Sequence, residues 1–171
     1  AALAITICDL YCKQKGLTLL SKEEIDDALK AIVWPARMEK IADTPLIFLD
    51  GAHNPHALRP VLNSFRERFS SYDKQVLFTC IRTKALDEML QLFAQADVSV
   101  TLTSFDDDRA VSESDMRRQA RQTGFSYQAW QEYLDTYLQE QHTDKEVLLI
   151  TGSLYFLAQV RAYISKKKEE M

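Results

Sequence analysis

The feature that most restricts the fold is an alternation of short apolar runs with helix-like segments beyond Trp34-Pro35. Each run is long enough for a buried strand and too short for a helix. The segments between the runs space apolar residues three and four positions apart, as at Leu58, Leu62 and Phe65. Strands that alternate with helices at this spacing predict a parallel sheet covered by helices on both faces.

The predicted elements follow one another in a regular order, which describes a small doubly wound α/β domain. Strands are expected at residues 45–50, 74–80, 98–103, 125–128 and 146–151. Helices are expected at residues 54–69, 85–96, 112–122, 129–141 and 153–166.

A short helical N-terminal segment precedes this domain. Residues 1–15 favour a helix that ends at Gly16, and a capping box predicts a second helix at 22–32. Trp34-Pro35 then interrupts the pattern, because the residue before a proline is pushed out of the helical region.

The charge and composition narrow the range of partners. With 21 basic and 25 acidic residues, the net charge of −4 provides no basic surface for nucleic acid. No apolar run approaches the roughly 20 residues of a membrane span, and the apolar start lacks the basic region of a signal peptide. Cys8, Cys12 and Cys80 are too few and too scattered for disulfides or a metal site, so we expect ordinary thiols and a cytoplasmic protein.

Two loops follow predicted strands at the sheet edge where ligands of open α/β folds bind. In the first, Asp50 can accept a hydrogen bond from a ribose hydroxyl, and His53 can donate one to a phosphate oxygen. Asn54 can cap the next helix, whose free N–H groups favour an anion. A well-capped turn with a surface histidine would explain the same residues, and both interpretations stay open.

The second loop, at residues 151–155, contains Gly152, which allows a close backbone approach. An efficient strand-to-helix turn is the alternative explanation of this loop. Both loops should open at the same edge of the sheet.

Several familiar enzyme motifs are missing from the sequence. The four glycines cannot form a G-x-G-x-x-G fingerprint or a P-loop, and no G-x-S-x-G elbow is present. The acidic run at residues 106–108 lacks the spacing of a calcium loop, so we expect a solvated loop there.

Three segments resemble the motifs of folylpolyglutamate and dihydrofolate synthases, which belong to the Mur ligase superfamily. Residues 34–39 (WPARME) resemble W-P-G-R-x-E, residues 49–55 (LDGAHNP) match the L-D-G-A-H-N-P signature, and residues 151–155 (TGSLY) match the closing T-G-S-L-Y. The likeness covers essentially the whole chain, and the superfamily's C-terminal domain is Rossmann-like. Ala36 replaces the usual glycine, and residues 81–85 lack the family's Asp-Lys-Asp element, so nothing is carried over from that loop.

The resemblance implies a ligase that uses ATP to phosphorylate a carboxylate of folate or dihydropteroate, which the amino group of L-glutamate then attacks. It implies ATP and Mg²⁺ as cofactors, with Arg37 at the phosphates, Asp50 at the sugar, and His53 and Asn54 close by. The planar guanidinium of an arginine suits phosphate and the charge of phosphoryl transfer.

The resemblance also implies a missing partner, the N-terminal ATPase domain that carries the P-loop and the metal ligands. We therefore expect residues 1–33 to be a helical remnant of that domain and the linker, residues 34–171 to be the Mur-ligase-type C-terminal domain, and the chain alone to be inactive. A standalone nucleotide- or ligand-binding module is the alternative. A Mur-type ligase for a cell-wall precursor fits the middle signature less well.

Overall fold

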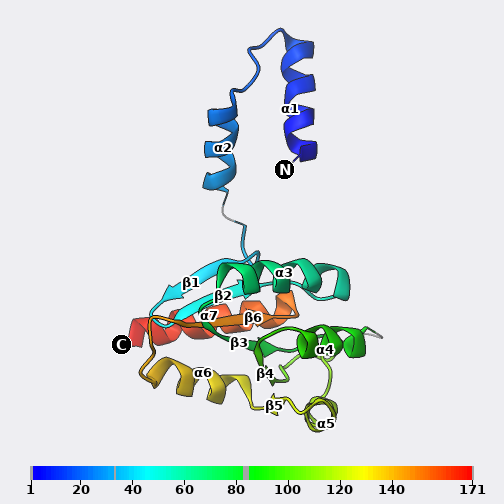
Figure 1. Ribbon diagram of the computed structural model, residues 1–171, viewed down its shortest axis with the longest axis vertical. Coiled ribbons are helices and arrows are strands. Elements are labelled where there is room, and N and C mark those ends of the chain that lie inside the picture. Colours follow the sequence, from blue (N-terminus) through cyan, green and yellow to red (C-terminus); the bar gives the residue numbers. More distant parts are fainter. Residues whose placement is uncertain (1, 33, 83–84, 171) are drawn as a thin grey trace. The chain divides into compact units, whose positions relative to one another are not determined.

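Figure 1 shows the computed structural model of the chain, which describes residues 2–32, 34–82 and 85–170, the last three by their backbone alone. The chain divides into two compact units, Ala1–Trp34 and Pro35–Met171. Val33 next to this division, and Thr83 and Lys84 in the loop from which nothing was carried over, lie outside the described residues.

The first unit consists of two helices, α1 (Ala2–Lys15) and α2 (Lys22–Ala31). Helix α1 stops directly before Gly16, as predicted, and Gly16 has a positive φ of 64°. The predicted capping box is confirmed, because the Ser21 hydroxyl accepts a hydrogen bond from the Glu24 N–H (3.2 Å) and the Glu24 carboxylate accepts one from the Ser21 N–H (2.8 Å). No described residue of either helix is buried, so these helices have no core of their own.

In its described residues, the second unit contains a sheet of six strands in the order β1-β2-β6-β3-β4-β5. All neighbouring strands are parallel except β1, which is antiparallel to β2. This arrangement confirms the predicted α/β class and its mostly parallel, Rossmann-like sheet. The strands are β1 (Glu39–Asp43), β2 (Leu46–Asp50), β3 (Asp73–Phe78), β4 (Ser99–Leu102), β5 (Ser126–Tyr127) and β6 (Glu146–Thr151). The helices are α3 (Pro55–Arg68), α4 (Leu86–Gln95), α5 (Glu113–Thr123), α6 (Trp130–Gln139) and α7 (Leu154–Glu170).

Helices cover both faces of this sheet (Figure 1). Successive side chains along a strand point to opposite faces, so apolar side chains on each face pack against the helices there. In β6, Val147 and Leu149 join a core with α3, α4 and α5, whereas Leu148 and Ile150 join a core with α6 and α7. A central strand buried on both faces reads as one continuous apolar run, which explains why the sequence indicates β6 so clearly.

Strand β1 is the element that the sequence analysis missed. Its sequence, EKIAD, is largely polar, and only Ala42 is buried. Such a pattern is typical of an exposed edge strand, which needs no apolar run. Because Glu39 pairs with Leu49, residues 35–38 directly before β1 lie beside the end of β2.

The two predicted loops lie at the same edge of the sheet, as expected. Strands β2 and β6 are parallel neighbours, and their last residues, Asp50 and Thr151, are partners in the register. The loops that begin at Gly51 and Gly152 therefore leave the sheet side by side.

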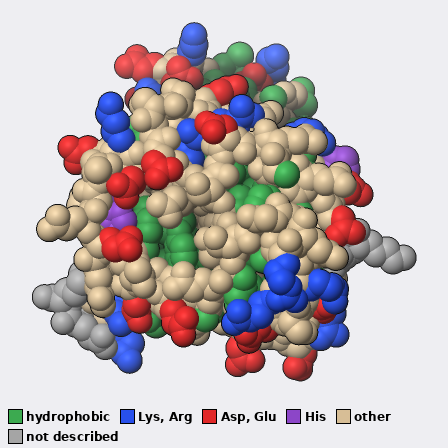
Figure 2. Space-filling model, turned by 60° about the horizontal axis from the view of Figure 1, so that its bottom comes forward, with side chains coloured by type: hydrophobic (Ala, Val, Ile, Leu, Met, Phe, Trp, Pro, Cys, Tyr) green, Lys and Arg blue, Asp and Glu red, His purple; other side chains and the backbone are tan. Residues whose placement is uncertain are grey.

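The surface carries charges of both signs, and Lys, Arg, Asp and Glu side chains are interspersed over the face in Figure 2. Within the described residues, none of the helices combines the length and the apolar character that crossing a membrane requires.

Candidate functional site

Gly51 is the centre of the first loop. A Cβ atom at this position would lie 2.5 Å from Leu154 Cδ2 and 3.1 Å from Arg37 Nη1. The Nδ1 atom of His53 lies 2.8 Å from the Gly51 carbonyl oxygen. The absence of a side chain at Gly51 thus lets Arg37, His53 and Leu154 gather around one backbone segment.

Asp50 is buried at the end of β2, with 3% of its surface exposed. Its Oδ2 accepts a hydrogen bond from the Met38 N–H (2.8 Å), and its Oδ1 accepts one from the Ala52 N–H (2.9 Å). Burial raises the pKa of the Asp50 carboxyl, against the lowering effects of these N–H groups and of the Arg37 charge. With both oxygens occupied by backbone donors, Asp50 joins the turn before β1 to the loop after β2. These contacts favour a positioning role over the predicted contact with a sugar.

His53 is exposed, and its one hydrogen bond restricts what it can do. Because a carbonyl oxygen only accepts, the bond to Gly51 places the ring proton on Nδ1. In the neutral ring Nε2 is then an acceptor, and it donates only when the imidazole is protonated. The predicted donation to a phosphate oxygen therefore requires the imidazolium, whereas the neutral ring suits a hydroxyl donor.

Arg37 lies on a tight turn whose neighbouring residues both have positive φ, 56° at Ala36 and 43° at Met38. The Gly51 N–H donates to the Ala36 carbonyl (2.8 Å), which fixes the turn against the first loop. Within the described part of the chain, the exposed Arg37 guanidinium forms no ion pair and makes only one long hydrogen bond, to the Ala36 carbonyl (3.4 Å). Its charge therefore remains available to an anion.

Asn54 caps helix α3, as the sequence predicts. Its side-chain oxygen accepts a hydrogen bond from the Ala57 N–H (2.9 Å), and Pro55 follows in the first turn. The positive end of the α3 dipole therefore points to the edge of the sheet that carries Gly51 and His53.

The second loop packs directly against neighbouring strand ends. Gly152 has a φ of 120°, and a Cβ atom there would lie 2.8 Å from the carbonyl carbon of Thr79. The Thr151 hydroxyl donates to the Ala52 carbonyl (3.4 Å), so the two loops are also linked to each other. Helix α7 starts immediately afterwards, and its first residues, Leu154 beside Gly51 and then Tyr155, are exposed.

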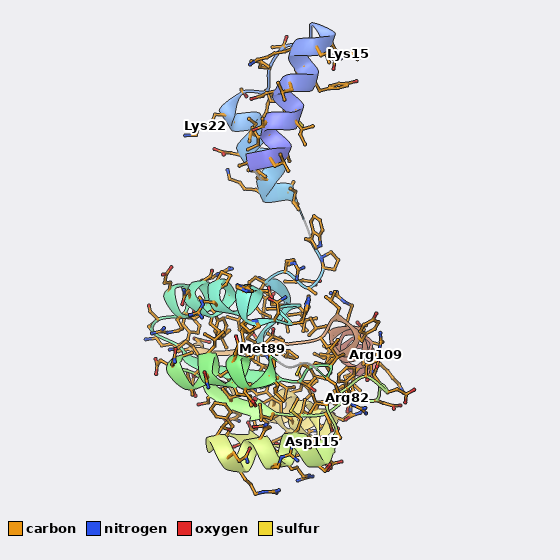
Figure 3. All side chains as sticks on the ribbon, turned by 90° about the vertical axis from the view of Figure 1, so that its right-hand side faces the viewer. Lys15, Lys22, Arg82, Met89, Arg109 and Asp115 are labelled. Atoms are coloured by element: carbon orange, nitrogen blue, oxygen red, sulfur yellow. The ribbon has the colours of Figure 1, made fainter. Side chains whose placement is uncertain are left out.

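The sequence analysis missed a group of charged and aromatic side chains beside the second loop. The guanidinium of Arg109 lies 4.0 Å from the centre of the Tyr155 ring and pairs with Asp107 at 2.7 Å, which lowers the pKa of that carboxyl to about 2. The Arg82 N–H donates to the Arg109 carbonyl (2.7 Å), and Figure 3 shows both arginines on the same side of the domain. Arg82, Arg109 and Tyr155 lie far apart in the sequence, and of these only Tyr155 belongs to one of the motifs.

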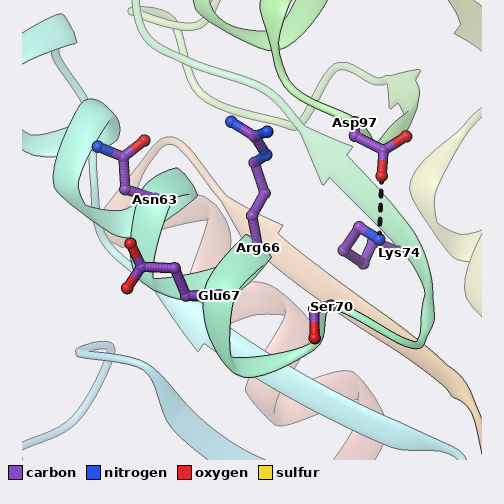
Figure 4. Close-up of a pocket in the computed structure, with 6 residues that line it drawn as sticks. All are labelled: Asn63, Arg66, Glu67, Ser70, Lys74 and Asp97. Carbon is purple, nitrogen blue, oxygen red and sulfur yellow. Dashed lines mark ion pairs between the residues drawn. The ribbon is translucent and has the colours of Figure 1, made fainter.

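A polar cavity of about 310 Å³ lies elsewhere, beside the start of β3 (Figure 4). There the buried Lys74 pairs with Asp97 at 3.3 Å, and Arg66 and Glu67 also line the cavity. Since β3 starts at the edge opposite to its carboxyl end, this cavity is remote from Gly51. Its lining charges offset one another, and it shares no residue with the predicted site.

A metal centre is not evident in the described residues, where no group of three or more His, Cys, Asp or Glu side chains is arranged to hold an ion. In the acidic run at residues 106–108, Asp107 is occupied by Arg109. The Cys80 thiol is buried, and burial raises its pKa to about 12, which disfavours the thiolate that binds metals.

Comparisons with known proteins place this arrangement in a family. The family described as Mur ligase, glutamate ligase domain, matches residues 36–154. A dihydrofolate synthase/folylpolyglutamate synthase of Bacillus subtilis is 27% identical over 164 residues, which cover 94% of this chain and 37% of that protein. A folylpolyglutamate synthase of Lacticaseibacillus casei is 34% identical over 161 residues, which cover 94% of this chain and 36% of that protein.

The fold is also similar to that of a solved structure, a bifunctional folylpolyglutamate synthase/dihydrofolate synthase of Yersinia pestis complexed with AMPPNP and Mn ion. The TM-score is 0.72 at 22% identity, over 85% of this chain and 35% of that one. The chain thus spans little more than a third of the length of the relatives that it matches.

Proposed function

The chain belongs to the Mur ligase glutamate ligase domain family, and from this membership we propose that it is the C-terminal domain of an ATP-dependent folylpolyglutamate synthase. The intact ligase would add L-glutamate to folate, and the dihydrofolate synthase activity named for the Bacillus subtilis relative would be a second reaction at the same site. Residues 1–33 would belong structurally to the preceding ATPase domain, and residues 34–171 would be the domain that closes over the nucleotide.

The observation that carries this proposal is the open grouping of Arg37 and His53 around Gly51. Both side chains are exposed at the edge of the sheet where ligands of open α/β folds bind. A cation without an ion pair and a helix start beside it suit the phosphates of a nucleotide that is held from the other side.

In this arrangement Arg37 contacts the phosphates of ATP and stabilises the charge that develops as the terminal phosphoryl group moves to the carboxylate. His53 accepts from a sugar hydroxyl or, when protonated, donates to a phosphate oxygen. Asn54 keeps the α3 start in place, and Asp50 keeps the Arg37 turn against the loop. This division of roles follows from which side chains are exposed and which are already bonded.

The divalent metal of the reaction, Mg²⁺ in this proposal, would not be bound by this domain. Its relative from Yersinia pestis is complexed with AMPPNP and Mn ion, which supports a nucleotide and a divalent metal in the family. The one carboxylate of the predicted site, Asp50, has both oxygens bonded to backbone N–H groups, so it does not fit a metal ligand. We therefore assign the metal ligands to the ATPase domain. The ligase would work in the cytoplasm, on folate, glutamate and ATP as its substrates.

A nucleotide titration of this chain by calorimetry, with ATP and magnesium, tests the division of the site between two domains. We expect no measurable binding, because the exposed residues contact a nucleotide from one side only. Clear binding would instead favour a standalone nucleotide-binding module. Formation of a γ-glutamyl product by this chain alone, from ATP, magnesium, glutamate and a reduced folate, would contradict the proposal outright.

Arg37→Ala in the intact ligase tests the role of the cation. Turnover should fall at least about 100-fold, the usual scale for loss of a group that stabilises transition-state charge. Stability should change by less than about 0.5 kcal/mol because the side chain is exposed and unpaired. Arg118→Ala is the matched control, an exposed arginine on α5 that pairs with Asp115. Equal turnover in the two variants would remove the proposed role of Arg37.

A further inference from the structure

We propose that Glu39 and Arg161 are positioning residues for Arg37. In this proposal Glu39 holds the turn that carries Arg37, and Arg161 of helix α7 holds Glu39. The consequence for catalysis rests on the proposed function, whereas the effect on the turn can be measured in this chain without it.

The Glu39 carboxylate joins the turn to α7. Its Oε2 accepts a hydrogen bond from the Ala36 N–H (2.7 Å), and its Oε1 accepts one from Arg161 Nη1 (2.8 Å). The second guanidinium nitrogen, Nη2, pairs with Oε2. This two-point contact leaves the carboxylate little freedom to rotate, so the hydrogen bond that it accepts from the Ala36 N–H has a defined direction.

The turn needs such a restraint because it is not a conformation that its residues prefer. Ala36 and Met38 both have positive φ, which is unfavourable for residues with a Cβ atom. Two carboxylates hold the N–H groups on either side of Arg37, Glu39 at Ala36 and Asp50 at Met38. Without Glu39, the Ala36 N–H would lose its carboxylate acceptor, although the Ala36 carbonyl would keep its bond to the Gly51 N–H.

Helix α7 therefore supports the site at two places. Leu154 in its first turn lies against Gly51, and Arg161, about two turns later, reaches Glu39. The same rigid helix thus sets the position of the loop and of the turn that faces it.

Amide hydrogen exchange of this chain tests the positioning directly. In Arg161→Met, which keeps an apolar stem, the Ala36 amide should exchange about tenfold faster, the scale expected for loss of a partly exposed charged hydrogen bond. The Leu77 and Ile150 amides in the sheet should keep their protection, which shows that the domain remains folded. Arg118→Met, which removes the exposed pair on α5, is the matched control. Unchanged exchange at Ala36 in Arg161→Met would overturn the proposal.

A charge swap distinguishes the route through the Ala36 N–H from a simple ion pair. The double variant Glu39→Arg and Arg161→Glu can restore the pair, but an arginine at position 39 cannot accept a hydrogen bond from the Ala36 N–H. The Ala36 amide should therefore stay unprotected. Restored protection would show that the ion pair alone holds the turn, and the proposed route would be wrong.

The kinetic test uses the intact ligase and two backgrounds. Arg161→Met should lower kcat/KM for ATP about tenfold, and Arg161→Lys should recover part of it, since a lysine keeps the charge but not the two-point contact. In an Arg37→Ala background, Arg161→Met should have no further effect, because it acts through Arg37. Additive losses would contradict that route. A ligase without activity in the parent form would instead contradict the proposed function and leave the exchange result standing.

Discussion

Gly152 is the position where one added methyl group should be most damaging. Its φ of 120° is a conformation that residues with a Cβ atom rarely adopt. The new atom would overlap the carbonyl oxygen of Thr79 and would lie 2.8 Å from its carbon and 2.9 Å from Cε2 of Phe78. Carbon atoms normally stay about 3.5–4.0 Å apart, so the strand ends would have to separate.

The surroundings of Gly152 cannot move easily. Thr79 is fully buried, and its N–H donates to the Thr151 carbonyl (3.4 Å) in the continuation of the β3–β6 ladder. Strain at a positive φ contributes about 1–2 kcal/mol and overpacking about 1–3 kcal/mol. We therefore expect Gly152→Ala to lose about 2–5 kcal/mol, a large part of the ~5–15 kcal/mol that stabilises an ordinary domain.

Urea unfolding measures this loss of stability if the fluorescence signal comes only from the domain that contains the sheet. In a Trp34→Phe background, the fluorescence comes from Trp130, which is buried in the core under α6 and α7. Gly124→Ala is the matched control, since Gly124 also has positive φ (77°) but has no atom within 4 Å of the added Cβ. That control should lose only ~1–2 kcal/mol. Equal losses in the two variants would refute the packing argument and leave backbone strain as the whole effect.

Three further outcomes are expected. Gly51→Ala should barely change the urea midpoint, because the atoms nearest to the added Cβ belong to the flexible Leu154 and Arg37 side chains. It should nevertheless lower turnover of the intact ligase by displacing Arg37. Unchanged turnover would contradict this expectation. Asp50→Asn should cost about 1–3 kcal/mol in the same unfolding assay, because an amide NH₂ would face a backbone N–H, and a neutral result would contradict its positioning role. Arg161 lowers the pKa of Glu39, so carboxyl NMR should show a titration midpoint for Glu39 below the usual value. The contribution of the ionised Glu39 to folding stability should be fully present above about pH 4.3 and should be lost as the pH falls through that midpoint. A midpoint at or above the usual value would show that the pair is not formed.

The strands and helices could be predicted where burial requires a recognisable pattern of apolar residues in the sequence. The β6 run EVLLIT is apolar because both faces of that strand are covered, and α3 shows its buried stripe at Leu58, Leu62 and Phe65. Strand β1 could not be found in this way, because an edge strand with one buried residue keeps the polar composition of a loop. Its partner, β2, supplies the hydrogen bonds that make it a strand.

The meeting of the two loops could be predicted, whereas the contacts of their side chains could not. The rule that parallel strands end at one edge brought the loops after Asp50 and Thr151 together, as the structure shows. The contacts of Asp50 depend on the turn at Ala36 and Met38, and no local pattern predicts which N–H group will reach a carboxylate. The Glu39–Arg161 pair joins residues 122 positions apart, so it follows only from the packing of α7 against the sheet.

The alanine at position 36 shows how this turn is kept in shape. The related motif has a glycine there, which would adopt the positive φ without strain but would also leave the turn free to move. Ala36 has a φ of 56°, and its methyl group is buried against the core beneath α6 and α7. Burial of one methyl stabilises by about 0.8 kcal/mol, which offsets much of the ~1–2 kcal/mol of backbone strain, and the Glu39 and Asp50 carboxylates supply the rest of the restraint. A strained turn held at both ends keeps the Arg37 backbone in one orientation, which would lower the entropy lost in the proposed binding of phosphates by that side chain.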